Sequence, residues 1–174
     1  MLFDKSMERL ICYPLTCQNT EYSIPNGIKT IDNYAFAGQE YICRLSMPDS
    51  VIEIGENAFR SCSTLEEIEM PAGLKVIKEN AFMECLLKYK LILPDGLETI
   101  GPCAFFGCYG LQYIKVPASV TDIGEAAFAR CSKNLTLIVE EDSAAEKYAI
   151  ENDIPYSYTD IDDFEFIEIE PQYG

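Results

Sequence analysis

The chain has 174 residues, of which 48% are hydrophobic, and its formal net charge is −16. This length fits one ordinary domain, the apolar content is too high for a disordered chain, and the acidic balance argues against nucleic acid as a partner. The sequence contains no His, so the commonest general base, the commonest zinc ligand and every Ser-His or Cys-His nucleophile pair are excluded.

Residues 1–18 are expected to form an N-terminal hairpin that caps the first repeat. Two short apolar stretches, at 1–3 and 9–13, flank a polar turn, which is the pattern of a β-hairpin. Residues 1–10 do not resemble a signal peptide, because acids interrupt their apolar stretch. No apolar run in the chain approaches the ~20 residues of a membrane helix, so we expect no membrane insertion.

Residues 19–139 repeat with a period of 23 residues, and five residue types recur in fixed columns. The columns are Pro25, Pro48, Pro71, Pro94, Pro117; Ile31, Ile54, Ile77, Ile100, Ile123; Ala35, Ala58, Ala81, Ala104, Ala127; Phe36, Phe59, Phe82, Phe105, Phe128; and Cys62, Cys85, Cys108, Cys131. Because a unit this short cannot bury its apolar side alone, the period predicts a solenoid of about five stacked coils.

Each unit predicts a short strand, a turn and a second short extended piece. In the unit that begins at Leu65, apolar Ile68 and Met70 alternate with acidic residues, which indicates a strand. Pro71 followed by Gly73 supplies the turn. The rest of the unit is too short for a long helix, so we expect one helical turn around the Ala-Phe pair.

These residues follow the pattern L-x-x-I-x-x-P-x-G/S-V-x-x-I-x-x-x-A-F-x-x-C, which resembles the BspA-like class of leucine-rich repeats. The resemblance implies an α/β-type leucine-rich repeat solenoid, with a curved parallel sheet of short strands, one per coil, and short helical turns. That family is mostly known from surface or secreted proteins of bacteria and protists, some of them adhesive. It therefore implies a location at the cell surface or outside the cell, although a cytoplasmic location stays open without a recognisable signal peptide.

Two positions depart from the pattern. Lys88 stands where a coil-facing Leu is expected, and we predict a local bulge there, with Leu86 or Leu87 filling the gap. Glu140 stands where the next Pro is expected, so the coiling should end near residue 139.

Residues 140–159 are expected to cap the C-terminal end with a helix. Ser143 and Glu146 form a capping-box pattern that opens a helix through about Ile150, which Asn152 and Pro155 should end. Residues 160–174 form a tail with six acids and no base. Its alternation of apolar and acidic residues fits either disorder or an edge strand, and we favour partial order.

The cysteines raise the question of a metal or a disulfide. The repeated row stands one per coil rather than in paired C-x-x-C motifs, which argues against zinc. Coils about 5 Å apart would permit disulfides, but a Cys three places after a buried Ala-Phe favours a reduced, packed row. Cys12 and Cys17 are close enough in sequence to pair in an oxidising compartment. We expect no metal and no cofactor.

Residues beside the inward pair of each strand should point outward and form a binding face, as extended solenoid surfaces do. The candidate ligand-binding residues on this face are Arg44, Glu66, Glu67, Glu69, Tyr89, Lys90, Ile92, Gln112, Tyr113 and Lys115. Its tyrosines, together with Ile92 and Ile138, are expected to be exposed apolar anchors. The charges also fit a purely structural role, because their sign alternates on adjacent strands at Glu21, Arg44, Glu67 and Lys90.

We expect a non-enzymatic scaffold that binds a protein or glycan at the bacterial cell surface or outside the cell, in an adhesion-like role. The clustered Glu66, Glu67 and Glu69 lie on an open sheet without a pocket that would separate their pKa values, so catalysis is not favoured. The alternative is a structural spacer segment of a larger surface protein.

Overall fold

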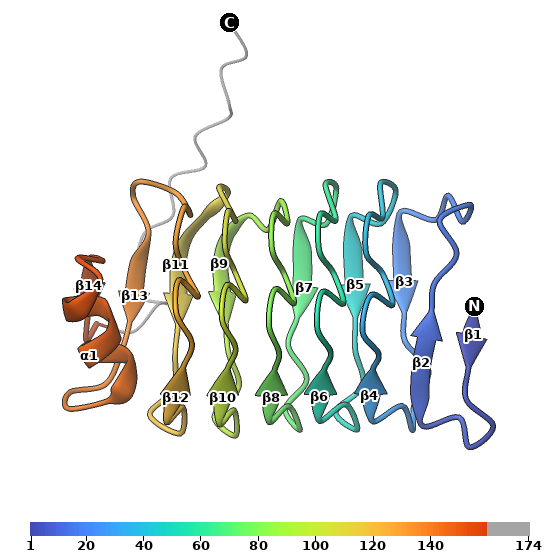
Figure 1. Ribbon diagram of the computed structural model, residues 1–174, viewed down its shortest axis with the longest axis horizontal. Helices are drawn as coiled ribbons and strands as arrows, with labels where there is room; N and C mark the ends of the chain where they lie inside the picture. The colour runs from blue at the N-terminus through green and yellow to red at the C-terminus, as the bar shows by residue number, and fades with distance from the viewer. Residues whose placement is uncertain (160–174) are drawn as a thin grey trace, which may run out of the picture.

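The computed structural model describes residues 1–159, which form a β-solenoid with stacked 23-residue units and, in this part of the chain, one short helix at the C-terminal end (Figure 1). Two rows of short strands run along the stack. The first row is a seven-stranded sheet of β1 (Leu2–Phe3), β2 (Arg9–Cys12), β4 (Thr30–Ile31), β6 (Glu53–Ile54), β8 (Val76–Ile77), β10 (Thr99–Ile100) and β12 (Asp122–Ile123).

The second row carries the strands that the sequence pattern predicts, and it is divided into two sheets. One sheet contains β3 (Glu21–Ser23), β5 (Arg44–Ser46) and β7 (Glu67–Glu69). The other contains β9 (Tyr89–Ile92), β11 (Leu111–Lys115), β13 (Thr136–Ile138) and β14 (Tyr156–Ser157). The expected parallel strands are therefore present, but the expected continuous sheet is interrupted between β7 and β9.

The register follows directly from the repeat length. Ile31 lies opposite Ile54, which lies opposite Ile77, and the same column continues to Ile123. Since each coil contains the same number of residues, the members of this column become neighbours in space.

The core contains a continuous stack of aromatic rings. The centroids of consecutive rings in the Phe column lie 4.9 to 5.6 Å apart, with interplanar angles of at most 16°. Tyr13 extends the stack at 5.1 Å from Phe36, and Tyr148 closes it edge-on at 5.7 Å from Phe128. Rings buried in this way supply much of the apolar area that stabilises each coil.

The Ala-Phe segments form hydrogen-bonded turns where short helical turns were expected. The Ala58 N–H donates to the Gly55 carbonyl within its own turn at 3.3 Å, whereas the Phe59 N–H donates to the Ala81 carbonyl of the next coil at 2.8 Å. Because alternate N–H groups bond to the neighbouring coil, the segment cannot continue as a helix.

The Cys column lies beside the aromatic stack, as expected, and all eight cysteines are free. Each thiol of the row donates to the carbonyl oxygen of a Phe of the preceding coil, for example Cys85 Sγ to Phe59 O at 2.9 Å. Burial raises the pKa of the Cys85 and Cys108 thiols and raises the pKa of Cys131 to about 11. Within residues 1–159, no three side chains of the metal-ligating types come together as a metal site.

Different devices cover the two ends of the stack. At the N-terminal end, β1 pairs antiparallel with β2, which pairs in parallel with β4. At the C-terminal end, α1 (Ala144–Glu151) begins where Ser143 Oγ accepts the Glu146 N–H at 3.1 Å, and Asn152 caps its last turn. The sequence did not predict β14, which pairs with β13. The expectations for the tail, 160–174, lie outside the described residues.

Candidate functional site

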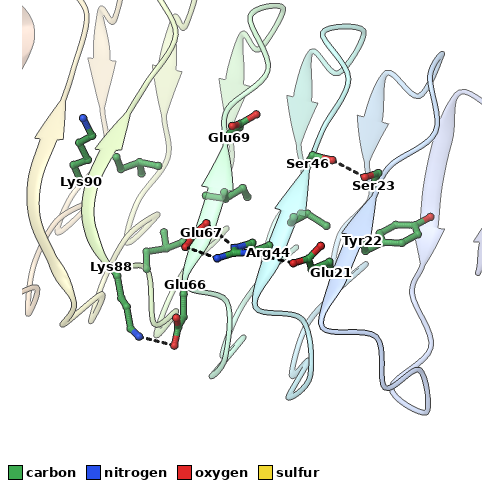
Figure 2. A pocket seen from close by; sticks show the side chains of 14 residues that line it. Glu21, Tyr22, Ser23, Arg44, Ser46, Glu66, Glu67, Glu69, Lys88 and Lys90 are labelled. Carbon is green, nitrogen blue, oxygen red and sulfur yellow. Dashed lines mark hydrogen bonds and ion pairs between the residues drawn. The ribbon is translucent and has the colours of Figure 1, made fainter. Parts of the chain in front are cut away.

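The candidate site lies on the outward face of β3, β5, β7 and β9, where a groove of about 350 Å³ opens to solvent (Figure 2). We call it the strand-face groove. It is lined by Glu21, Tyr22, Ser23, Arg44, Leu45, Ser46, Glu66, Glu67, Ile68, Glu69, Leu87, Lys88, Lys90 and Leu91. Successive strands present equivalent positions there because they are one repeat apart.

Arg44 is the central charged residue of the strand-face groove. Its Nε lies 2.8 Å from Glu67 Oε2, and its Nη1 lies 3.2 Å from Glu21 Oε1. Its hydrogen bond to Glu67, and then the charge of Glu67 and the contacts with Glu21, raise the pKa of the guanidinium. Since all three side chains are at least 60% exposed, these ion pairs orient the guanidinium more than they stabilise the fold.

Two further contacts fix polar groups in the same groove. Lys88 Nζ lies 2.7 Å from Glu66 Oε1, and Ser46 Oγ donates to Ser23 Oγ at 2.8 Å (Figure 2). Lys88 was expected only as a departure from the repeat, and Ser23 and Ser46 were not among the candidate residues. Their signal in the sequence is their place in the same outward columns.

The alternating charges behave as cross-strand pairs only up to β7. Glu21 lies opposite Arg44, and Arg44 lies opposite Glu67, in a regular parallel register. The next member of the column, Lys90, belongs to β9, beyond the interruption of the sheet. The regular cross-strand pairing therefore includes the first three charges of the column.

The interruption begins where the sequence departs from its pattern. Leu87 is buried at 2% exposure and Leu86 is 40% exposed, so Leu87 fills the gap that Lys88 leaves. Tyr89 then takes a left-handed backbone conformation with φ at 57°, which is uncommon for a bulky residue. The bulge was expected at Lys88, but the residue that the pairing skips is Gln112, on β11 of the next coil.

Close packing behind the interruption keeps this arrangement in place. A Cβ atom at Gly110 would lie 2.4 Å from the Leu87 carbonyl oxygen, so only glycine fits there. The Tyr89 N–H donates to the Gly110 carbonyl at 3.0 Å. The displaced chain around Leu87 thus packs closely against its C-terminal neighbour, while the Lys88 N–H still donates to the Glu66 carbonyl before β7.

The structure divides the candidate residues between two sheets. Arg44, Glu67 and Glu69 lie on the first sheet, with Glu66 immediately before β7. The second sheet carries Tyr89, Lys90, Ile92, Gln112, Tyr113 and Lys115. Ile92 is 44% exposed, as expected, and both tyrosines are half-buried. The expectation for Ile138 is wrong, because this side chain is buried at 3% exposure on the strand that pairs with β14.

Comparisons with known proteins agree with this architecture. The family model described as BspA type leucine rich repeat region matches residues 12–136 in six copies. A leucine rich cell surface protein from Faecalibacterium prausnitzii A2-165 is 35% identical with a TM-score of 0.74, over 85% of this chain and 39% of that one. A leucine rich repeat protein of T. pallidum is 30% identical with a TM-score of 0.69, over 78% of this chain and 65% of that one.

The fold extends to more distant proteins. The pneumococcal vaccine antigen PcpA is 20% identical, with a TM-score of 0.72 over 91% of this chain and 46% of that one, which shows a shared fold alone. A comparison with curated proteins gave no match. This chain spans less than two thirds of the length of each of these three solved structures.

The helix found in residues 1–159 is too short and too polar to cross a membrane. Since the family model covers most of the chain, the protein belongs to the BspA-type leucine-rich repeat family.

Proposed function

We propose that this chain is a non-enzymatic repeat scaffold whose strand face binds a protein or glycan ligand at the bacterial cell surface or outside the cell. The observation that carries the proposal is the strand-face groove, in which Glu21 and Glu67 hold Arg44 in a fixed orientation. A guanidinium fixed before the ligand arrives loses less side-chain entropy on binding. The F. prausnitzii relative, described as a cell surface protein, supports the location.

The chemistry of the groove fits binding better than catalysis. Its Glu66 and Glu67 carboxylates are each paired with a cation. The groove is open to water, and the whole sequence lacks His. Such a surface offers hydrogen bonds and charge to a ligand without excluding solvent from a reacting group.

The test is a screen of the full chain against host extracellular-matrix proteins and glycans, followed by Arg44→Ala. We expect this variant to weaken a ligand found in the screen by at least tenfold. Arg60→Ala, which removes an exposed guanidinium from a turn outside the groove, is the matched control. A ligand that both variants bind like the parent protein would exclude the groove.

The second candidate function is a structural spacer within a larger surface protein. It is favoured by the length of the solved relatives, since this chain covers 39% of the F. prausnitzii protein. The spacer proposal predicts that the screen finds no ligand for this chain.

A further inference from the structure

The interruption between β7 and β9 is confined to one face of the solenoid. Behind it, the rings of Phe82 and Phe105 stack at 5.2 Å with an interplanar angle of 3°. On the opposite row β8 and β10 pair in regular register. The two coils therefore remain stacked, while β7 and β9 separate at the strand face, as Figure 1 shows.

The separation leaves two strand edges facing one another. In the described part of the chain, β7 pairs with β5 and β9 pairs with β11, so each has one edge without a partner strand. The Cα atoms of β7 and β9 lie for the most part more than 8 Å apart. Paired strands lie about 4.8 Å apart, and an inserted strand needs about twice that spacing. We call this space the inter-strand slot.

The inter-strand slot also exposes part of the core. Ile68 and Met70 point inward from the β7 segment but are only half-buried. Their equivalents one repeat earlier, Leu45 and Met47, are 3% and 9% exposed. A second groove of about 660 Å³ lies beside Ile68 and Met70 and continues the strand-face groove, with which it shares Ile68, Glu69 and Lys90. Apolar core side chains at an open strand edge mark a place where another strand can pack.

We propose that the inter-strand slot binds an extended, cationic segment of a partner polypeptide, which pairs with β7 and β9 as an additional strand. The inference rests on the proposed binding function and names the class of partner. Strand addition obtains its affinity from main-chain hydrogen bonds and its specificity from alternate side chains. Lys88 N–H, which donates to the Glu66 carbonyl at 3.0 Å, closes the slot at the start of β7.

The residues around the inter-strand slot define the side chains of the inserted segment. Inward positions cover Ile68 and Met70 and are therefore apolar. Outward positions lie between residues one repeat apart. At Glu67 and Lys90 the two strands carry opposite charges. At Glu69 and Ile92, both exposed, the only charge is the carboxylate. A Lys or Arg there places its charge at the carboxylate and packs its aliphatic stem on the isoleucine. The net charge of −16 further attracts a cationic partner.

The test uses the full chain and a fluorescent, end-blocked peptide of alternating Lys and Val, with binding followed by anisotropy. We expect saturable binding that falls at least tenfold when alternate backbone N–H groups of the peptide are methylated. Glu69→Lys should weaken binding by at least tenfold. Glu56→Lys, the same charge change at an exposed position in the turn after β6, should have a much smaller effect. Melting curves of both variants verify that they fold.

Several outcomes would overturn the inference. Equal affinity for the methylated peptide would mean that no strand pairing occurs, and equal weakening by both charge variants would mean a non-specific attraction. Absence of binding would exclude this class of ligand. Binding that appears only after removal of residues 160–174 would assign the inter-strand slot to this chain's own C-terminal segment. A dimer of the free protein that Glu69→Lys abolishes would assign it to a second copy.

The two sets of variants distinguish a failure of this inference from a failure of the proposed function. If a ligand from the screen loses affinity with Arg44→Ala but not with Glu69→Lys, the strand-face groove is a binding site and the inter-strand slot is not. If the peptide binds as expected and Arg44→Ala leaves every screened ligand unaffected, the slot is supported and the proposed role of the groove fails.

Discussion

The four repeated cysteines donate hydrogen bonds to the carbonyl oxygens of the Phe column. The thiols of Cys62, Cys85, Cys108 and Cys131 each donate to a carbonyl 26 residues earlier, at 2.9 to 3.1 Å. In the first coil the same place in the repeat is occupied by Gln39, whose Nε2 donates to the Tyr13 carbonyl at 3.3 Å. The members of this column therefore share a side-chain donor for a turn carbonyl of the preceding coil.

Cys85→Ala should lower the free energy of unfolding by ~0.5–1.5 kcal/mol, because the buried Phe59 carbonyl loses the thiol donor and keeps only the hydrogen bond from the Cys62 N–H. Cys85→Ser retains a donor and should cost less. Urea denaturation of both variants gives the comparison. A serine variant less stable than the alanine variant would mean that the hydrogen bond contributes little.

Thiol reactivity should follow burial. Cys12 is exposed and should react with a thiol reagent first, whereas the row should stay unreacted in the native protein near neutral pH. Within the row Cys131, whose pKa burial raises to about 11, should react before Cys85 and Cys108 as the pH rises. Mass spectrometry of labelled peptides measures the order.

The same shift links pH to stability. Because the folded state raises the pKa of Cys131 above the ordinary value of 9.0, its contribution is fully present below that pH. It is lost as the pH rises towards about 11. Thermal melts across this range should show that the melting temperature falls as the pH rises.

A chelator should not change the melting temperature at neutral pH. A chelator-dependent shift would mean that a metal stabilises the fold.

At the scale of elements, stacking of the aromatic rings stabilises the contact between one coil and the next. Phe82 is fully buried and has a stacked ring on each side, at 5.0 and 5.2 Å. The strands themselves are short, and in the first row each strand from β4 to β12 has only two residues. Side-chain packing between coils must therefore supply most of the cooperativity of the stack.

Phe82→Ala should destabilise the protein by ~3–5 kcal/mol, because it leaves a cavity in the middle of the stack. Phe106→Ala is the matched control, since Phe106 is only half-buried and lies outside the stack. Denaturant unfolding of the two variants tests the difference. Equal losses at the two positions would contradict the central role of the stack.

At the scale of the whole molecule, charge is the dominant surface property. The net charge is −16, and most of the ion pairs resolved on the surface, such as that of Lys75 with Glu98 at 3.4 Å, join two exposed side chains. Exposed pairs contribute little, whereas unbalanced like charges repel one another throughout the solenoid.

Salt should therefore stabilise this protein. Raising the salt concentration from about 0.05 to about 0.5 M shortens the screening length and should raise the melting temperature. Glu56→Lys with Glu125→Lys reduces the net charge at exposed turn positions and should reduce the salt effect. A melting temperature that falls with added salt would show that ion pairs outweigh the repulsion.

The sequence by itself determined the solenoid, the register and the buried columns, because equal coil lengths bring each column into contact with itself. Ile31 to Ile123, the Phe rings and the thiols all follow from that period, as does the helix that Ser143 caps. The N-terminal extension of the aromatic stack by Tyr13 also keeps the 23-residue step, although only the structure revealed it.

Only the tertiary structure decided where the strand face is interrupted. At Leu87 the inward-facing position is shifted by one residue, but the repeat length stays the same. The shift is therefore accommodated locally, by the left-handed backbone of Tyr89 and the close packing against Gly110. The exposure of Ile68, the burial of Ile138 and the pairing of β14 depend on which strands meet across coils. The pairing of β14 joins residues that are not one repeat apart, and the interruption removes a pairing that the repeat predicts, so no column predicts either.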